Sequence, residues 1–149
     1  MSTLEYLQRN KVHFTTHEHP RTASARRLAK ALCEKVSHVA RAMVVKVDGE
    51  FVVVLVQALH RLNLERIRES LGARSAELAS RLELRELFPD CEPGIVPPFG
   101  SQSGLRTVID RSLCRQPHLF LDIRTKHEAL RLQTCDFVRL EQPLVTDVA

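Results

Sequence analysis

The sequence predicts a mixed α/β (α+β) fold, in which one compact domain spanning residues 1–149 has a central mixed, partly barrel-like β-sheet flanked by short helices. The length is typical of one domain, and no internal repeat or linker divides it. With 44% hydrophobic and 27% charged residues, the composition is that of an ordinary globular protein. Strand patterns that alternate with short amphipathic helical patterns give the α/β class.

The N-terminal segment predicts a helix, a strand and a second helix. Ser2 followed by Glu5 fits a capping box, and this first helix ends at the polar run 9–11. A short strand is expected over Val12–Thr16, with His17–Pro20 as its exit loop. The apolar spacing of the second helix, which Thr22 or Ser24 caps, predicts one buried face, formed by Ala25, Leu28, Ala29 and Leu32.

A β-hairpin is the clearest local prediction. Val39–Val47 and Glu50–Ala58 are rich in β-branched residues and flank Asp48-Gly49, a pair suited to a two-residue turn in which both residues have positive φ. Every position from Phe51 to Val56 is apolar, so this strand is expected to be covered on both faces.

The C-terminal half predicts two capped helices, a long loop, three strands and a last helix. Asn63 caps a helix that ends at Gly72, and Ser80 with Glu83 forms a capping box for a helix that ends before Pro89. The loop from Pro89 to Gly104 is rich in proline and glycine, and such long loops are often functional. After it we expect strands over Arg106–Ile109, Leu119–Ile123 and Ala129–Leu132, and a helix that begins at Thr134.

Several functional classes are not supported by the sequence. No apolar run approaches the ~20 residues of a membrane span, and the N-terminus lacks the profile of a signal peptide, so a cytoplasmic protein without a membrane partner is expected. The four cysteines are scattered, and His13, His17 and His19 are interpreted as surface residues in a loop, so no metal or other cofactor is predicted. Cys91 is interpreted as a packing residue rather than a nucleophile.

The most informative segment is Phe88-Pro-Asp-Cys-Glu-Pro-Gly-Ile-Val-Pro-Pro-Phe-Gly100. Together with the preceding Asp48-Gly49 hairpin and the following Val108-Ile-Asp110, it resembles the YbaK-like family of aminoacyl-tRNA deacylases, which is related to the editing insertion of bacterial prolyl-tRNA synthetases. The resemblance runs from about Thr22 to Leu140, and Gly94-x-x-x-Pro98 followed by Phe99-Gly100 is its most specific part.

The chemistry of ester hydrolysis explains why such a loop would be used. An aminoacyl ester is already activated, so its hydrolysis requires a positioned water and donors for the developing oxyanion more than a strong nucleophile. Glycine lets the backbone approach the ester and proline stiffens the loop, which keeps backbone N–H groups aimed at it. Gly94, Pro98 and Gly100 are therefore the expected catalytic loop residues, with Val96, Pro97 and Phe99 beside the substrate. The alternative is a rigid turn over the core.

The resemblance also implies a basic residue on the first hairpin strand, which contacts the terminal adenosine and its phosphate. Relatives usually carry lysine at the position of Arg41, and Arg41 is the expected catalytic and binding residue here. Lys46 is a second candidate contact. Because the two are five positions apart, an odd spacing, they are expected on opposite faces of the strand, with Arg41 toward the cleft and Lys46 toward solvent near the turn.

The remaining candidate substrate contacts follow from the resemblance. Asp110 either orients a loop N–H group or the substrate ammonium group, or caps the turn at Arg111 and Ser112. Arg124 stands near a position where relatives commonly have glycine, and it either narrows the amino-acid pocket or adds a tRNA phosphate contact. Thr22 and His127 complete the set of expected substrate-binding residues.

Together these features predict an enzyme, a trans-editing aminoacyl-tRNA deacylase that hydrolyses the ester of mischarged tRNA. The expected partner is the aminoacylated CCA end of tRNA, and an aminoacyl-tRNA synthetase is a further candidate partner. Two alternatives stay open: a module that binds tRNA without catalysis, and a hydrolase of another small acyl ester. Neither the edited amino acid nor the oligomeric state follows from the sequence.

Overall fold

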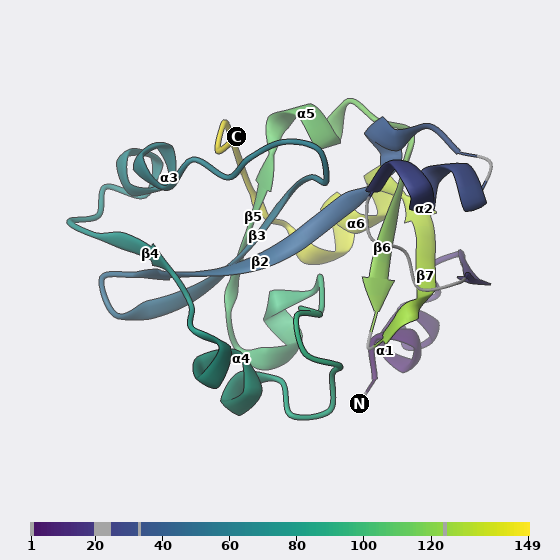
Figure 1. The fold of residues 1–149 in the computed structure, drawn as a ribbon, viewed down its shortest axis with the longest axis horizontal. Helices are drawn as coiled ribbons and strands as arrows, with labels where there is room; N and C mark the ends of the chain where they lie inside the picture. Colours follow the sequence, from purple (N-terminus) through teal and green to yellow (C-terminus); the bar gives the residue numbers. More distant parts are fainter. Residues whose placement is uncertain (1, 20–24, 33, 124) are drawn as a thin grey trace.

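Two β-sheets form the centre of the computed structural model, which describes residues 2–19, 25–32, 34–123 and 125–149 (Figure 1). The larger sheet has five strands in the order β4 (Ala76–Leu78), β2 (Ala40–Val47), β3 (Glu50–Gln57), β5 (Arg106–Asp110) and β8 (Leu144–Thr146). Strands β4, β2 and β3 pair antiparallel, whereas β3, β5 and β8 pair parallel. The smaller sheet is antiparallel, in the order β1 (Phe14–Glu18), β7 (Thr125–Gln133) and β6 (His118–Ile123).

This arrangement confirms the predicted α/β class with a mixed sheet. An isolated parallel bridge between Val39 and Phe120 joins the start of β2 to β6, and the strands that are described close no barrel. No helix in the described ranges is both long and apolar enough to cross a membrane.

The hairpin was predicted correctly in position and in turn chemistry. Asp48 has φ 49° and Gly49 has φ 84°, so both central residues adopt positive φ. The Asp48 carboxylate accepts hydrogen bonds from the N–H groups of Arg74 and Ser75, which compensates for the left-handed conformation of a non-glycine residue.

The helices are short, and those that follow Ser2, Asn63 and Ser80 begin at the predicted caps, although only half of the predicted capping box at Ser2 forms. Ser2 Oγ accepts from Glu5 N, Asn63 Oδ1 accepts from Arg66 N, and Ser80 forms the full capping box with Glu83. The caps Thr22 and Ser24 lie outside the described residues. The helices are α1 (Thr3–Arg9), α2 (Ala25–Ala31), α3 (Leu64–Ser70), α4 (Arg81–Leu87), α5 (Arg111–Cys114), α6 (Thr134–Glu141) and the 3₁₀ turns η1 (Val36–His38) and η2 (Gly100–Ser103).

Strand β3 separates two clusters of buried apolar side chains, as its uninterrupted apolar run predicts. Val53 and Leu55 belong to the main core, which lies between the sheets and includes α1, α6 and the loop after α4. Val52, Val54 and Val56 belong to a second core beneath α3. Helices α3 and α4 accordingly lie on opposite sides of the larger sheet (Figure 1).

Strand boundaries in the smaller sheet needed correction. β1 begins at Phe14 rather than Val12 and continues through His17 and Glu18, which were expected in an exit loop. The polar ends of this strand pair with the backbone of β7, a long-range contact without a local sequence pattern. For the same reason β7 is longer than predicted, and three short elements, β4, α5 and β8, were not predicted at all.

The interpretation of the N-terminal histidines as surface loop residues was also wrong in part. His13 is exposed, but His17 is half-buried within β1 and hydrogen-bonds to Thr15. His19 is buried, with its Nε2 3.4 Å from a carboxylate oxygen of Asp122.

Candidate functional site

The loop predicted to carry the chemistry begins with an ordered turn. Pro93 and Gly94 occupy the centre of a turn in which Ile95 N donates to Glu92 O at 3.0 Å. Gly94 has φ 88°, the left-handed conformation that a type II turn requires after proline. Gly94 is exposed and Pro97 is half-buried, so this part of the loop is accessible.

The end of the loop is anchored in the main core. Phe99 has no exposed surface and packs edge-on against Tyr6 at 5.5 Å between ring centroids, and against Phe137 at 5.0 Å. Val96 and Pro98 are buried as well. The expectation that Phe99 contacts substrate is therefore wrong, because its side chain fills the space behind the loop.

Gly100 is held by a hydrogen-bond network that sequence analysis missed. Its N–H donates to Thr107 Oγ1 at 3.1 Å, and this hydroxyl donates to Glu141 Oε1 at 2.6 Å. The Glu141 carboxylate also accepts from Ser101 N at 2.9 Å and Ser101 Oγ at 2.7 Å. Thus α6 fixes η2 from behind, and the Gly100 N–H group is not free to bind an oxyanion.

Only glycine fits at position 100. A Cβ atom there would lie 2.6 Å from Thr107 Oγ1 and 3.1 Å from Leu105 O. Gly100 therefore has a structural role in the loop, because its backbone packs so closely against β5 that no side chain fits.

Two backbone donors nearer the loop centre remain available. Within the described part of the chain, the N–H groups of Gly94 and Val96 donate to no protein acceptor. The loop therefore presents N–H groups on a backbone that proline and the buried Phe99 stiffen.

Arg41 and Lys46 lie on opposite faces of β2, as their spacing predicts. In the pairing of β2 with β3, Arg41 is opposite Val56, and Val56 belongs to the core beneath α3. Lys46 is opposite Phe51, which packs against the main core. The loop packs on the main core too, so it shares a face with Lys46 rather than with Arg41.

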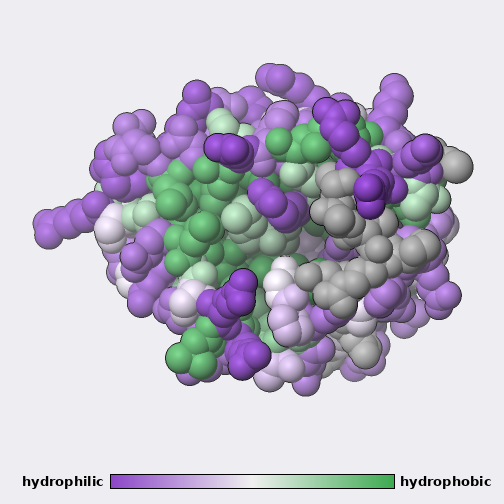
Figure 2. Space-filling view, viewed as in Figure 1, coloured by the Kyte–Doolittle hydropathy of each residue, from purple (hydrophilic) through white to green (hydrophobic). Residues whose placement is uncertain are grey.

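The environments of the two cations also differ. Lys46 Nζ lies 3.2 Å from Glu83 Oε2 and 5.7 Å from the centre of the Phe51 ring, so the expectation that Lys46 faces only solvent needs correction. Arg41 is exposed and has no ion pair or hydrogen bond to any residue that the structure describes. Figure 2 shows apolar surface between α3 and the strands β2 and β4. Met43, on the same face of β2 as Arg41, is half-buried against the second core.

Arg41 stands at an open edge of the sheet. Strand β4 pairs only with residues 45–47 of β2, and Ala79 N donates to Val44 O. Residues 40–43 pair with no strand on that side in the described ranges. This unpaired stretch lies between the bridge from Val39 to β6 and the pairing with β4.

Asp110 caps the turn at Arg111 and Ser112, which was one of the two roles predicted for it. Its carboxylate accepts from Ser112 N and Oγ at the start of α5, and from Val148 N and Ala149 N. Burial alone would raise the pKa of this carboxyl, but the hydrogen bonds outweigh it and hold the pKa below the ordinary value. Asp110 thus ties the C-terminal segment to α5.

His127 lines a shallow hollow between β1 and β7. The hollow is lined by Glu18, His19, Thr125, His127 and Glu128. Thr22 and Arg124, which were expected near the substrate, lie outside the described residues.

The comparisons with known proteins assign the family. The family model described as aminoacyl-tRNA editing domain matches residues 19–140. The chain belongs to the aminoacyl-tRNA editing domain family. This confirms the resemblance to YbaK-like deacylases.

Individual relatives agree with this assignment. A proline–tRNA ligase of Bacillus mycoides (strain KBAB4) is 37% identical over 73 residues, which is 49% of this editing domain chain but only 13% of the ligase. A crystal structure described as a candidate trans-editing enzyme for prolyl tRNA synthetase has a TM-score of 0.80 and 25% identity, and covers 91% of this chain and 86% of its own. The hypothetical protein APE2540, at 21% identity, shares the fold with a TM-score of 0.87 over 97% of each chain.

Proposed function

We propose that this editing domain acts in trans and hydrolyses the ester bond between an amino acid and the terminal adenosine of a mischarged tRNA. The observation that carries the proposal is the loop from Gly94 to Gly100. Two of its N–H groups donate to no acceptor among the described residues, and its backbone is anchored by Phe99 and the Glu141 network. Family membership supplies the class of substrate, and the geometry supports the chemistry.

In the proposed reaction, water adds to the ester carbonyl carbon. Negative charge develops on the carbonyl oxygen, and the N–H groups of Gly94 and Val96 stabilise it. The carbon–oxygen bond to the ribose then breaks, and the ribose oxygen takes up a proton lost by the water. The products are the free amino acid and a tRNA with a free terminal hydroxyl.

Arg41 is proposed to anchor the terminal nucleotide. Its exposed guanidinium has no acidic partner among the described residues, and its planar fork can bind two phosphate oxygens. Binding through such contacts weakens as the salt concentration rises, because phosphate contacts release counterions.

The proposed substrate surface continues beside the loop. Pro97 is half-buried at the accessible part of the loop, and His127 stands in the hollow between β1 and β7. We propose both as contacts to the aminoacylated CCA end, and propose prolyl-tRNA synthetase as the synthetase whose errors the domain corrects, in line with the relatives above.

A panel of mischarged tRNAs tests the proposal. Deacylation is measured for wild type, Arg41→Ala, Arg41→Lys and Gly94→Ala, with Gly49→Ala as the matched control. Gly49 also has positive φ, at 84°, but lies in the hairpin turn, so this control reproduces the backbone strain away from the loop.

Loss of turnover in Gly94→Ala and Arg41→Ala, with activity retained in Gly49→Ala, is the expected result. A wild-type protein that binds tRNA but hydrolyses none of the panel would establish the binding module instead. Hydrolysis of small acyl esters without any action on tRNA would establish the third alternative.

A further inference from the structure

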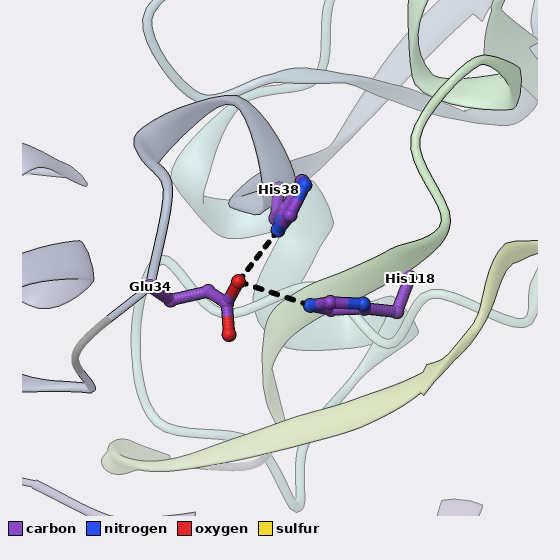
Figure 3. A group of neighbouring side chains, drawn as sticks. All are labelled: Glu34, His38 and His118. Atoms are coloured by element: carbon purple, nitrogen blue, oxygen red, sulfur yellow. Dashed lines mark hydrogen bonds and ion pairs between the residues drawn. The ribbon is translucent and has the colours of Figure 1, made fainter.

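A cluster of three titratable side chains lies outside the loop and outside the proposed substrate surface. Glu34 follows α2, His38 ends η1, and His118 begins β6 (Figure 3). The bridge between Val39 and Phe120 brings these distant segments together, because each bridge residue lies within two positions of a histidine of the cluster.

The three side chains converge on one carboxylate oxygen. Glu34 Oε1 lies 2.7 Å from His38 Nδ1 and 3.1 Å from His118 Nε2 (Figure 3). The side chains of His38, His118 and Glu34 are only 8%, 15% and 20% exposed. Although the 3.1 Å separation is short, His118 Nε2 makes no hydrogen bond of acceptable geometry in the described structure.

The cluster brings one carboxylate oxygen and two imidazole nitrogens close together. An ionised carboxylate and two imidazole nitrogens are a donor set that binds transition metals.

The spacing of these donors matches a small metal site. The ligand atoms lie within 4.8 Å of one another. In a tetrahedral zinc site with bonds of about 2.1 Å, neighbouring ligand atoms are about 3.4 Å apart. The carboxylate oxygen would therefore move by less than about 1 Å relative to each nitrogen to admit an ion.

We propose that Glu34, His38 and His118 bind a divalent transition-metal ion of the zinc class. Two imidazoles and one carboxylate favour such an ion over Mg²⁺ or Ca²⁺, which prefer sites built of oxygen ligands. The ion would tie β6 to the segment that follows α2. In that segment His38 stands three positions before Arg41. This inference does not depend on the proposed editing reaction.

Arg131 opposes metal binding in the present arrangement. Its Nη2 lies 3.5 Å from Nδ1 of His118. When Nε2 of His118 binds a metal, Nδ1 carries the ring proton, so the guanidinium must turn away. Arg131→Gln offers an amide oxygen that can accept this proton in a hydrogen bond, and it is expected to bind the ion more tightly than wild type.

The first test uses the unaltered chain, stripped with a chelator and kept under a reducing agent. Zn²⁺ is added while long-range ¹H–¹⁵N NMR spectra of the histidine rings are recorded. The expected result is a saturating shift of His38 Nδ1 and His118 Nε2 at one equivalent. Shifts confined to other histidines, or no shift, would overturn the proposal in favour of a purely hydrogen-bonded cluster.

The second test uses variants. By calorimetry, Glu34→Gln and His118→Gln are expected to weaken Zn²⁺ binding by at least about 10-fold, while His60→Gln, at an exposed histidine, leaves it unchanged. Added Zn²⁺ is expected to raise the thermal midpoint of wild type but not of His118→Gln. Equal Zn²⁺ affinity in wild type and in either cluster variant would refute the site.

Discussion

The carboxylate of Glu141 offers a direct test of how the loop is held. Glu141→Ala removes the acceptor for Ser101 N, Ser101 Oγ and Thr107 Oγ1. Each hydrogen bond to a charged group contributes about 1 to 3 kcal/mol, and these bonds are partly exposed to water, so about 1 kcal/mol each is appropriate. We expect the free energy of unfolding to fall by about 3 kcal/mol.

Glu141→Gln separates charge from shape. The amide oxygen can keep the two donors that now bind Oε1, but the amide nitrogen cannot accept from Ser101 Oγ, so a loss of about 1 kcal/mol is expected. Glu86→Ala is the matched control, because Glu86 is an exposed helical glutamate without a partner among the described residues. It should change stability by less than about 0.5 kcal/mol.

Urea unfolding and thermal unfolding measure these differences. For a chain of this length, 1 kcal/mol corresponds to about 3 to 4 °C in Tm, so Glu141→Ala is expected to melt about 10 °C below wild type. If Glu141→Ala were as stable as Glu86→Ala, the network would not hold the loop backbone in place.

Three further predictions concern the same region. Asp110→Asn should lower the free energy of unfolding by about 3 kcal/mol near neutral pH. Because the pKa of Asp110 in the folded protein lies below its ordinary value of 3.8, the difference from wild type should shrink as the pH falls below 3.8. A difference in urea unfolding that stays constant across this pH range would contradict the capping role of Asp110. Gly100→Ala should cost about 1 to 3 kcal/mol, because its Cβ would clash with Thr107 Oγ1 and Leu105 O; a Tm equal to that of wild type would contradict this. Phe99→Ala should cost about 3 to 5 kcal/mol, measured by chemical denaturation, and a smaller loss than about 1 kcal/mol would show that the ring does not anchor the loop.

Local chemistry determined which parts of the fold could be predicted. The hairpin follows from Asp48-Gly49, because only a few residue pairs accept positive φ at both turn positions. The caps at Ser80 and Asn63 follow from side chains that bind backbone groups three residues away. The apolar run of β3 predicts burial on both faces for the same local reason.

The features that could not be predicted depend on contacts between distant segments. The hydrogen bonds of Glu141 join residues 34 to 40 positions apart, and no spacing rule links a glutamate at a helix end to Thr107. Glu34 and His118 meet only because β2 and β6 are bridged. The loop Gly94–Gly100 was found from sequence, but whether a given side chain faces substrate or core, as for Phe99, depends on packing.

The opposite faces of Arg41 and the loop lead to a last prediction about substrate length. A ligand that contacts both must reach from one face of the larger sheet to the other, which an extended CCA end can do and a small ester cannot. Arg41→Ala should therefore slow deacylation of tRNA by about 10- to 100-fold, the equivalent of one lost charge-assisted contact, while hydrolysis of an amino-acid methyl ester stays within about twofold of wild type. Arg41→Lys should keep part of the tRNA activity, because it retains the charge without the fork. Equal losses on both substrates would show that Arg41 acts at the scissile ester itself, and the anchoring role proposed for it would be wrong.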